Sequence, residues 1–183
     1  FALNPVLDFA RCYLEQPDVF GDDAGIPESG NGIPDLLDEI KWELDWLLKM
    51  QEPDDSVLCV VGGGKASQPS DDAPARRYGT APTSASFSAA AMFAVGSVVF
   101  EKAGINAYST QLQTAAIDAW NWAVAHPGIT FNNSGKLAAG EQEVDDYGLF
   151  TGRLCAAVYL YDITGEVAYK SWVENNYAQH HLL

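Results

Sequence analysis

The sequence predicts an all-α fold built from two layers of helices. Apolar residues recur at helical spacing in several segments that turns or loops separate. One of these segments, 83–100, is apolar or small on every side, which is typical of a helix that other helices surround. Such a buried helix alternating with amphipathic ones, with short turns at one end and long loops at the other, favours an α/α toroid.

The first helix begins near Asn4 and Pro5 and ends before Gln16–Pro17. We expect Asn4 to be its N-cap, because a side-chain oxygen there accepts a bond from a backbone N–H of the first turn. Pro5 fits the first turn, where a missing N–H has no cost. Only three residues precede this helix and no methionine starts them, so we expect the chain to be cut from something longer.

The second helix follows the turn Gly30–Asn31–Gly32 and begins near Pro34. It has two apolar rows, which predict neighbours on two sides. The tryptophans of the second row, with Trp122 of a later helix, are expected in the core. Asp45 and Lys49 are spaced to form an i,i+4 ion pair. The first row is Ile33, Leu36, Leu37, Ile40, Leu44, Leu47 and Leu48, and the second is Trp42, Trp46 and Met50.

A long connection separates this helix from the buried one. Residues 56–61 are rich in β-branched side chains and precede three glycines, so they predict an extended strand. A polar loop then runs to Pro82, and a loop of this length inside a compact domain is usually functional or disordered. The run Gly62–Lys65 lacks the spacing of a phosphate-binding loop.

The remaining helices are predicted from periodicity and stop signals. Thr83 or Ser84 is the expected cap of the buried helix, which stops at Gly104. Its composition indicates a core helix and not a membrane span. The later helices are predicted at 108–125, around Leu154–Tyr161 up to Thr164–Gly165, and from about Glu166 onward.

Composition and charge limit the classes of molecule that the chain is expected to bind. With 183 residues, 48% of them hydrophobic, the chain is long enough for one or two globular domains. The formal net charge of −15 repels phosphate backbones and anionic membranes, so neither nucleic acid nor membrane is an expected partner. The three cysteines have no motif spacing and are expected as buried, reduced thiols; metal ligation by Cys59 or Cys155 is the alternative.

The segment 26–51, from Ile26–Pro27–Glu28 to Lys49–Met50–Gln51, resembles the signature of glycoside hydrolase family 9 cellulases. Tyr78–Gly79, with segments 83–85, 119–123 and 156–166, is also similar to that family. The resemblance covers nearly the whole chain but only about the first half of a full barrel. It implies an (α/α)6 barrel, of which residues 1–183 form one partial catalytic domain. It also implies a secreted enzyme that hydrolyses β-1,4-glucans with inversion.

Inverting hydrolysis needs one carboxylic acid and one carboxylate, about 6.5–9.5 Å apart. The resemblance implies that the base belongs to an Asp-Ala-Gly-Asp motif upstream of the matched region and that the acid lies near the end of the domain. No catalytic residue is therefore expected in this chain. Asp23–Ala24–Gly25 matches three positions of the motif, but Ile26 replaces the second aspartate, and we interpret the segment as a turn.

Two departures from the family concern binding. Many members carry a His-Lys pair where Cys59–Val60 stands, so sugar contacts from that pair are absent. Many also carry an Asp-Glu pair, associated with a calcium site, where Thr151–Gly152 stands. Asp145–Asp146 lie upstream and offer a cation an alternative site, although acids at a helix start more often complement its N-terminal charge.

For substrate contact the sequence points to the long loops. Tyr78 and Tyr147 are expected to stack on glucose rings, while Arg77 and Asp146 hydrogen-bond hydroxyl groups. The alternative is that each is an ordinary packed or exposed loop residue.

The leading hypothesis is part of a secreted endo-β-1,4-glucanase that needs no cofactor for its chemistry and takes a β-glucan as its partner. The alternative is a non-catalytic helical module that binds glycans or another protein. We also expect the isolated chain to be inactive and to self-associate, because half a toroid would expose inner faces such as that of helix 83–100.

Overall fold

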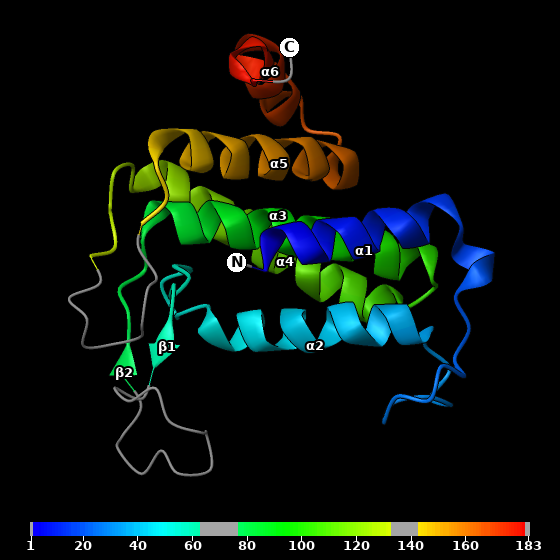
Figure 1. Ribbon diagram of the computed structural model, residues 1–183. Coiled ribbons are helices and arrows are strands. Elements are labelled where there is room, and N and C mark those ends of the chain that lie inside the picture. The colour runs from blue at the N-terminus through cyan, green and yellow to red at the C-terminus, as the bar shows by residue number, and fades with distance from the viewer. Residues whose placement is uncertain (1, 63–76, 133–142, 182–183) are drawn as a thin grey trace.

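The computed structural model describes residues 2–62, 77–132 and 143–181. Within these ranges the chain forms six α-helices and one short antiparallel ladder (Figure 1). The ladder pairs β1 (Val61–Gly62) with β2 (Arg77–Tyr78). Short 3-10 turns cover Pro17–Val19 and Tyr177–Gln179. The helices are α1 (Leu3–Glu15), α2 (Asp35–Met50), α3 (Thr83–Lys102), α4 (Asn106–Ala125), α5 (Asp146–Thr164) and α6 (Val167–Asn176).

The six helices form three consecutive hairpins, α1–α2, α3–α4 and α5–α6, as Figure 1 shows. The first helices of the hairpins, α1, α3 and α5, form the inner layer, in which α3 lies in the middle and contacts both others. The second helices, α2, α4 and α6, pack on the outside of this layer. The expected two-layer, all-helical arrangement is confirmed.

Helix α3 is the centre of the hydrophobic core. Fourteen of its twenty residues are buried, because α1, α2, α4 and α5 all pack against it. It is long and apolar enough to cross a membrane, yet 78% of its most apolar window is buried inside the fold, as a core helix would be. The expectation that the isolated half toroid would leave helix 83–100 exposed is wrong, since the neighbouring hairpins already cover it.

The predicted helix caps are only partly correct. Helix α1 begins at Leu3, so Asn4 lies inside the first turn and caps nothing. The N-cap of α3 is Pro82, and the Thr83 hydroxyl instead donates to the His126 carbonyl oxygen. The helix predicted around Leu154–Tyr161 ends as expected, at Gly165 in the left-handed region with φ 68°.

The tryptophan row of α2 does not lie in the core. Trp42 is 74% exposed and Trp46 is 40% exposed, so the prediction that they are core residues is wrong, whereas Trp122 packs against the core as expected. The leucine row faces α1 and α3, but in the described part of the chain no helix covers the opposite face of α2. Periodicity marks a face as apolar and does not say which segment covers it.

Two other predicted features, an ion pair of α2 and a strand, involve residues a few positions away from those expected. Asp45 pairs with Lys41 and not with Lys49, and it also accepts a 2.7 Å hydrogen bond from Tyr108 Oη. Burial, together with that carboxylate, raises the pKa of Tyr108. The predicted strand 56–61 is shorter and begins at Val61.

The three cysteines all lie in the described part of the chain, and no disulfide joins them. Cys12 is exposed, which corrects the expectation of a buried thiol, while Cys59 and Cys155 are half-buried. Burial raises the pKa of Cys155 and keeps it protonated.

Candidate functional site

Two long connections, that between α2 and α3 and that between α4 and α5, meet at one end of the helical layers, where α3 and α5 begin and the ladder of β1 and β2 lies (Figure 1). We call this the loop end. The opposite end carries the connection between α1 and α2, together with the short turns between α3 and α4 and between α5 and α6. All four residues expected to contact substrate lie at the loop end, on β2 or in the first turn of α5.

The first turn of α3 holds both connections in place. Its Thr83 N–H donates to the Ile129 carbonyl oxygen at 2.9 Å, and Ser86 Oγ accepts the Val57 N–H at 3.1 Å. Ser84 Oγ donates to Glu143 Oε1, while Glu143 Oε2 accepts the Phe131 N–H at 2.7 Å. Residues far apart in the sequence are thereby joined to one rigid helix start.

Gly79 is packed tightly against Val60 and Cys59 of its own connection and against Phe131 of the connection between α4 and α5. Its N–H donates to the Val60 carbonyl oxygen at 2.8 Å. A Cβ built on Gly79 would lie 2.6 Å from Val60 Cγ1, 2.8 Å from Cys59 Sγ and 3.2 Å from Phe131 Cε2. Only glycine therefore fits between these side chains without displacing them.

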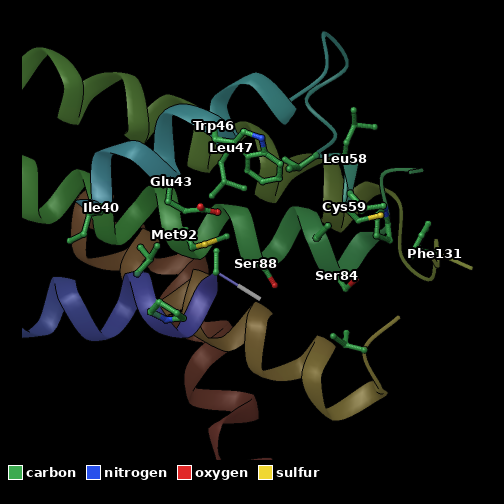
Figure 2. A pocket seen from close by; sticks show the side chains of 18 of the residues that line it. Ile40, Glu43, Trp46, Leu47, Leu58, Cys59, Ser84, Ser88, Met92 and Phe131 are labelled. Atoms are coloured by element: carbon green, nitrogen blue, oxygen red, sulfur yellow. The ribbon is translucent and has the colours of Figure 1, made fainter. Parts of the chain in front are cut away.

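A pocket of about 680 Å³ lies between α1, α2 and the start of α3 and reaches Val144 beside the loop end (Figure 2). Its walls are mainly aliphatic and aromatic, and three carboxylates line it. Glu143 uses its oxygens in the network above, whereas burial raises the pKa of Glu43. The carboxylates are those of Glu39, Glu43 and Glu143, among walls that include Phe9, Ile40, Trp46, Leu47, Val57, Met92 and Phe131.

The expected substrate contacts form two separate pairs of neighbours. Arg77 and Tyr78 follow one another on β2; the Tyr78 side chain is 62% exposed, and the Arg77 side chain lies outside the described atoms. Asp146 and Tyr147 open α5, where Asp146 is exposed. In the described part of the chain, no hydrogen bond or ring contact joins Tyr78 to Asp146 or Tyr147.

Tyr147 has one covered ring face. Its ring lies parallel to the imidazole of His181, with centroids 3.7 Å apart and 5° between the planes. Its hydroxyl oxygen accepts the His181 backbone N–H at 3.1 Å. The segment that follows α6 thus returns to the loop end and leaves Tyr147 at most one face for a sugar ring.

Sequence reasoning did not single out Glu143, Ser84 or Glu43. Glu143 is one of four acids between residues 141 and 146, so no spacing distinguishes it from its neighbours, and Ser84 was noticed only as a possible cap. Glu43 belongs to a helix in which only Asp45 and Lys49, among the charged residues, were given a role from the sequence. The available signal for Glu43 was its position in the sequence between Trp42 and Trp46, two residues of the second apolar row.

The calcium site that the family resemblance implies does not fit the residues at that place. Thr151 Oγ1 donates to the Gly148 carbonyl oxygen at 3.0 Å, and Gly152 is buried against Ser88, so neither position offers a carboxylate. Asp145 Oδ1 accepts the Gly148 N–H at 2.7 Å and is the N-cap of α5. This is the capping role that acids at a helix start most often have.

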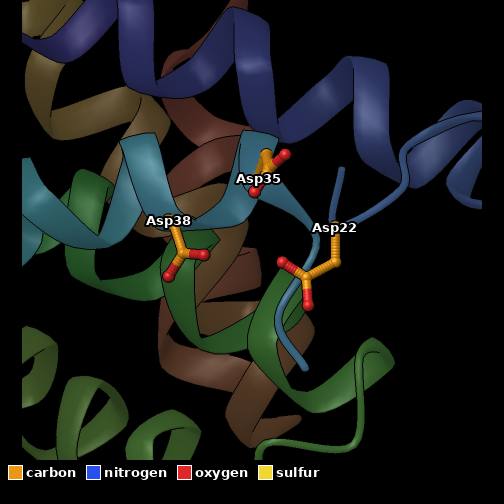
Figure 3. Close-up of side chains that lie close together, drawn as sticks. All are labelled: Asp22, Asp35 and Asp38. Carbon is orange, nitrogen blue, oxygen red and sulfur yellow. The ribbon is translucent and has the colours of Figure 1, made fainter. Parts of the chain in front are cut away.

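Asp22, Asp35 and Asp38 lie together at the end opposite the loop end (Figure 3), with oxygen atoms within 4.8 Å of one another. Each has its own donor. The Gly30 and Gly32 N–H groups donate to Asp22, Ser29 Oγ to Asp35, and Asn31 Nδ2 to Asp38. The cluster thus fixes the turn that precedes α2.

The chain is similar to one protein family, to individual proteins and to solved structures. The model of glycosyl hydrolase family 9 matches residues 6–183. Endoglucanase C of Cellulomonas fimi is 32% identical over 162 residues, which are 81% of this chain and 14% of that protein. Endoglucanase D of Acetivibrio thermocellus is 29% identical over 163 residues, which are 84% of this chain and 25% of that protein.

Among solved structures, a metagenome-derived glycoside hydrolase family 9 endoglucanase matches 95% of this chain with a TM-score of 0.85 and 29% identity. A family 9 protein of Bacteroides ovatus matches 91% with a TM-score of 0.82 and 28% identity. The chain spans only 32% and 33% of those two structures. The matches confirm the expected fold class, part of an (α/α)6 barrel, for these three hairpins.

Proposed function

This chain belongs to glycosyl hydrolase family 9, and we propose that the protein containing it hydrolyses β-1,4-glucosidic bonds in cellulose or a related β-glucan. The observation that carries the proposal is the family match over residues 6–183, together with the superposition of nearly the whole chain on a family 9 endoglucanase. We propose that residues 1–183 are one part of the catalytic domain and not a module of their own.

We propose an inverting mechanism, in which one carboxylic acid protonates the leaving oxygen while a carboxylate activates water on the opposite face of the sugar. Two acids in the described part of the loop end have other roles. Glu143 bridges Ser84 and Phe131, and Asp145 caps α5. These hydrogen bonds give both carboxylates a structural role, which supports the inference that both catalytic carboxylates lie outside this chain.

The role proposed for this chain is to hold the substrate. The rings of Tyr78 and Tyr147 would each stack on the apolar face of a glucose unit, while Arg77 and Asp146 would hydrogen-bond hydroxyl groups. The exposure of Tyr78 supports this role, as does the position of Tyr147 at the start of an inner helix. No cofactor takes part in the proposed chemistry, and we propose that the protein is secreted to reach its polymer.

The test is hydrolysis of a soluble β-1,4-glucan by the full-length protein, followed by proton NMR of the first products. Release of the α-anomer supports inversion. Release of the β-anomer would overturn the inverting mechanism while leaving the hydrolase assignment in place.

A different result would favour the non-catalytic glycan-binding module. In that case the protein would not hydrolyse the glucan but would be retained on amorphous cellulose, and Tyr78→Ala would abolish the retention. Such an outcome would overturn the enzyme assignment, because binding would then be the only activity of the site.

A further inference from the structure

The segment that follows α6 returns to the loop end as a short, hydrogen-bonded turn. It forms a 3-10 turn and then brings His181 against Tyr147. The side chain of Asn176 holds this turn, because its Nδ2 donates to the Trp172 carbonyl oxygen at 2.7 Å and its Oδ1 accepts Gln179 Nε2 at 3.2 Å. His181 therefore approaches Tyr147 from a defined backbone position.

Two contacts join His181 to Tyr147, and they come from different parts of the histidine. Its imidazole lies parallel to the phenol ring, with the centroids 3.7 Å apart. Its backbone N–H donates to the Tyr147 hydroxyl oxygen at 3.1 Å. The ring contact depends on the side chain at position 181, whereas any residue except proline supplies the N–H. Substitution of His181 can therefore remove the stack and keep the hydrogen bond.

The other aromatic neighbours of Tyr147 meet it at an angle. The Phe150 ring lies along the same helix, with centroids 6.1 Å apart and 34° between the planes, and the His180 ring lies 5.9 Å away at 50°. Phe150 in turn contacts Trp172 of α6, with centroids 6.2 Å apart. Among the aromatic side chains of the described residues, His181 alone lies face to face with Tyr147.

This stack removes a cost that sugar binding would otherwise carry. Tyr147 is only half-buried, in the first turn of α5, where a tyrosine side chain can rotate between staggered positions. A sugar that stacks on a mobile ring must order it, and ordering one such side chain weakens binding about 2- to 10-fold. The imidazole of His181 orders the ring before the sugar binds.

We propose that His181 is a positioning residue for the substrate: its imidazole holds the Tyr147 ring in the orientation in which the open face stacks on a glucose unit. His181 acts through Tyr147 and does not itself contact the sugar. The stack also makes Tyr147 a one-sided platform, because the imidazole occupies the face that a second sugar ring would need. This inference rests on the proposed function, and on the stacking role of Tyr147 in particular.

The experiment is steady-state kinetics of the full-length protein on a soluble β-1,4-glucan. We expect His181→Ala to raise the KM about 2- to 10-fold, and no more than Tyr147→Ala does, with a smaller effect on kcat. His181→Phe keeps a flat ring and the backbone N–H, so its KM should return close to that of the wild type.

The double variant of His181→Ala with Tyr147→Ala separates positioning from direct contact. Its KM should equal that of Tyr147→Ala alone, because the histidine then has no ring to position. A KM that reflects the product of the two single effects would show that His181 acts independently of Tyr147, and would overturn the inference.

His126→Ala is the matched control. The imidazole of His126 also stacks on an aromatic ring, that of Trp122, with centroids 4.5 Å apart and 20° between the planes. His126 follows the end of α4, and in the described part of the chain it has no ring contact with Tyr147. Both variants lose one imidazole stack and can lower the Tm, but only His181→Ala should raise the KM. An equal rise for both would indicate a general loosening of the fold and would overturn the inference.

The remaining outcomes separate this inference from the proposed function. A wild-type KM for His181→Ala, beside a raised KM for Tyr147→Ala, would overturn the inference and keep Tyr147 in the substrate site. A wild-type KM for Tyr147→Ala would overturn both the stacking role and the inference, while the hydrolase assignment would stand. A wild-type protein that hydrolyses no β-glucan would overturn the proposed function, and the inference would fall with it.

Discussion

The ring of Tyr147 is stacked on the imidazole of His181, parallel to within 5° and with the two centroids 3.7 Å apart. The contact ties the start of α5 to the segment that follows α6, so the open face of Tyr147 has a fixed orientation at the loop end. A fixed aromatic ring is what a sugar-binding surface requires, since no conformational freedom is lost when the sugar binds.

If Tyr147 stacks on substrate, Tyr147→Ala in the full-length protein raises the KM for β-glucan about 2- to 10-fold, with a smaller effect on kcat. Tyr147→Phe keeps the ring and should stay close to wild type. Tyr161→Ala, near the other end of the same helix, is the control. Steady-state kinetics decide; an unchanged KM for Tyr147→Ala would remove it from the substrate site.

Arg153 has no carboxylate partner among the described residues, and its Nε is buried without a hydrogen bond. Its guanidinium instead faces the rings of Phe87, Trp120 and Trp172, with 4.6 Å to the last centroid. Burial lowers the pKa of Arg153, so these rings must offset the cost of the charge.

We therefore expect Arg153→Ala to destabilise the fold by about 2–4 kcal/mol through lost packing between four helices. Arg153→Met fills the same space and can contact the rings through sulfur, so its cost should stay below about 1.5 kcal/mol. Urea unfolding followed by tryptophan fluorescence measures both. A Met variant as unstable as the Ala variant would show that the charge itself holds the helices together.

Gly79→Ala tests how tightly Gly79 is packed against Val60 and Cys59. The added methyl group would overlap Val60 and Cys59, and moving them should cost about 1–3 kcal/mol and disturb β2, which carries Tyr78. The Tm should fall, and affinity for β-glucan should fall with it. Thr80→Ala, at an exposed neighbour, should leave both unchanged; a wild-type Tm for Gly79→Ala would contradict the geometry.

The turn before α2 makes stability depend on pH. Backbone N–H groups, that of Gly32 first, lower the pKa of Asp22 in the folded protein below its unfolded value of about 3.9. Asp22 therefore contributes stability above that unfolded value, and the contribution is lost as the pH falls through the folded pKa. Asp22→Asn should lower the Tm at neutral pH, and the difference from wild type should shrink in acid. Asp23→Asn is the control; a difference that is constant with pH would show that the charge of Asp22 does not matter.

The isolated 183-residue chain should release no reducing sugar from a soluble β-glucan, because both catalytic groups are proposed to lie outside it and each contributes about 10²- to 10⁴-fold. It should also self-associate through the exposed face of Phe9, Trp42 and Trp46, and not through the inner face of helix 83–100 that the sequence analysis gave as an example. Activity assay and size-exclusion chromatography test the two statements. A monomeric, active fragment would mean that its own acids perform the chemistry.

The helices and their order were predictable because each carries a clear period and a stop signal, as at Gly165. The exposure of Trp42 was not predictable, because an apolar face indicates burial but not which segment provides it. The role of Glu143 was equally hidden, since its partners Ser84 and Phe131 are brought to it only by the tertiary fold. The network at the loop end depends on contacts between distant residues, which local spacing does not encode.

The burial of α3 also has a consequence for synthesis. Its last neighbour in the inner layer, α5, begins roughly 40 residues after α3 ends. At translation rates of about 5–20 residues per second, that interval lasts about 2–9 s. During this time the most apolar helix of the chain is complete while one of its sides has no partner, so the nascent protein depends on a chaperone or on early docking of α1 and α4 to stay soluble.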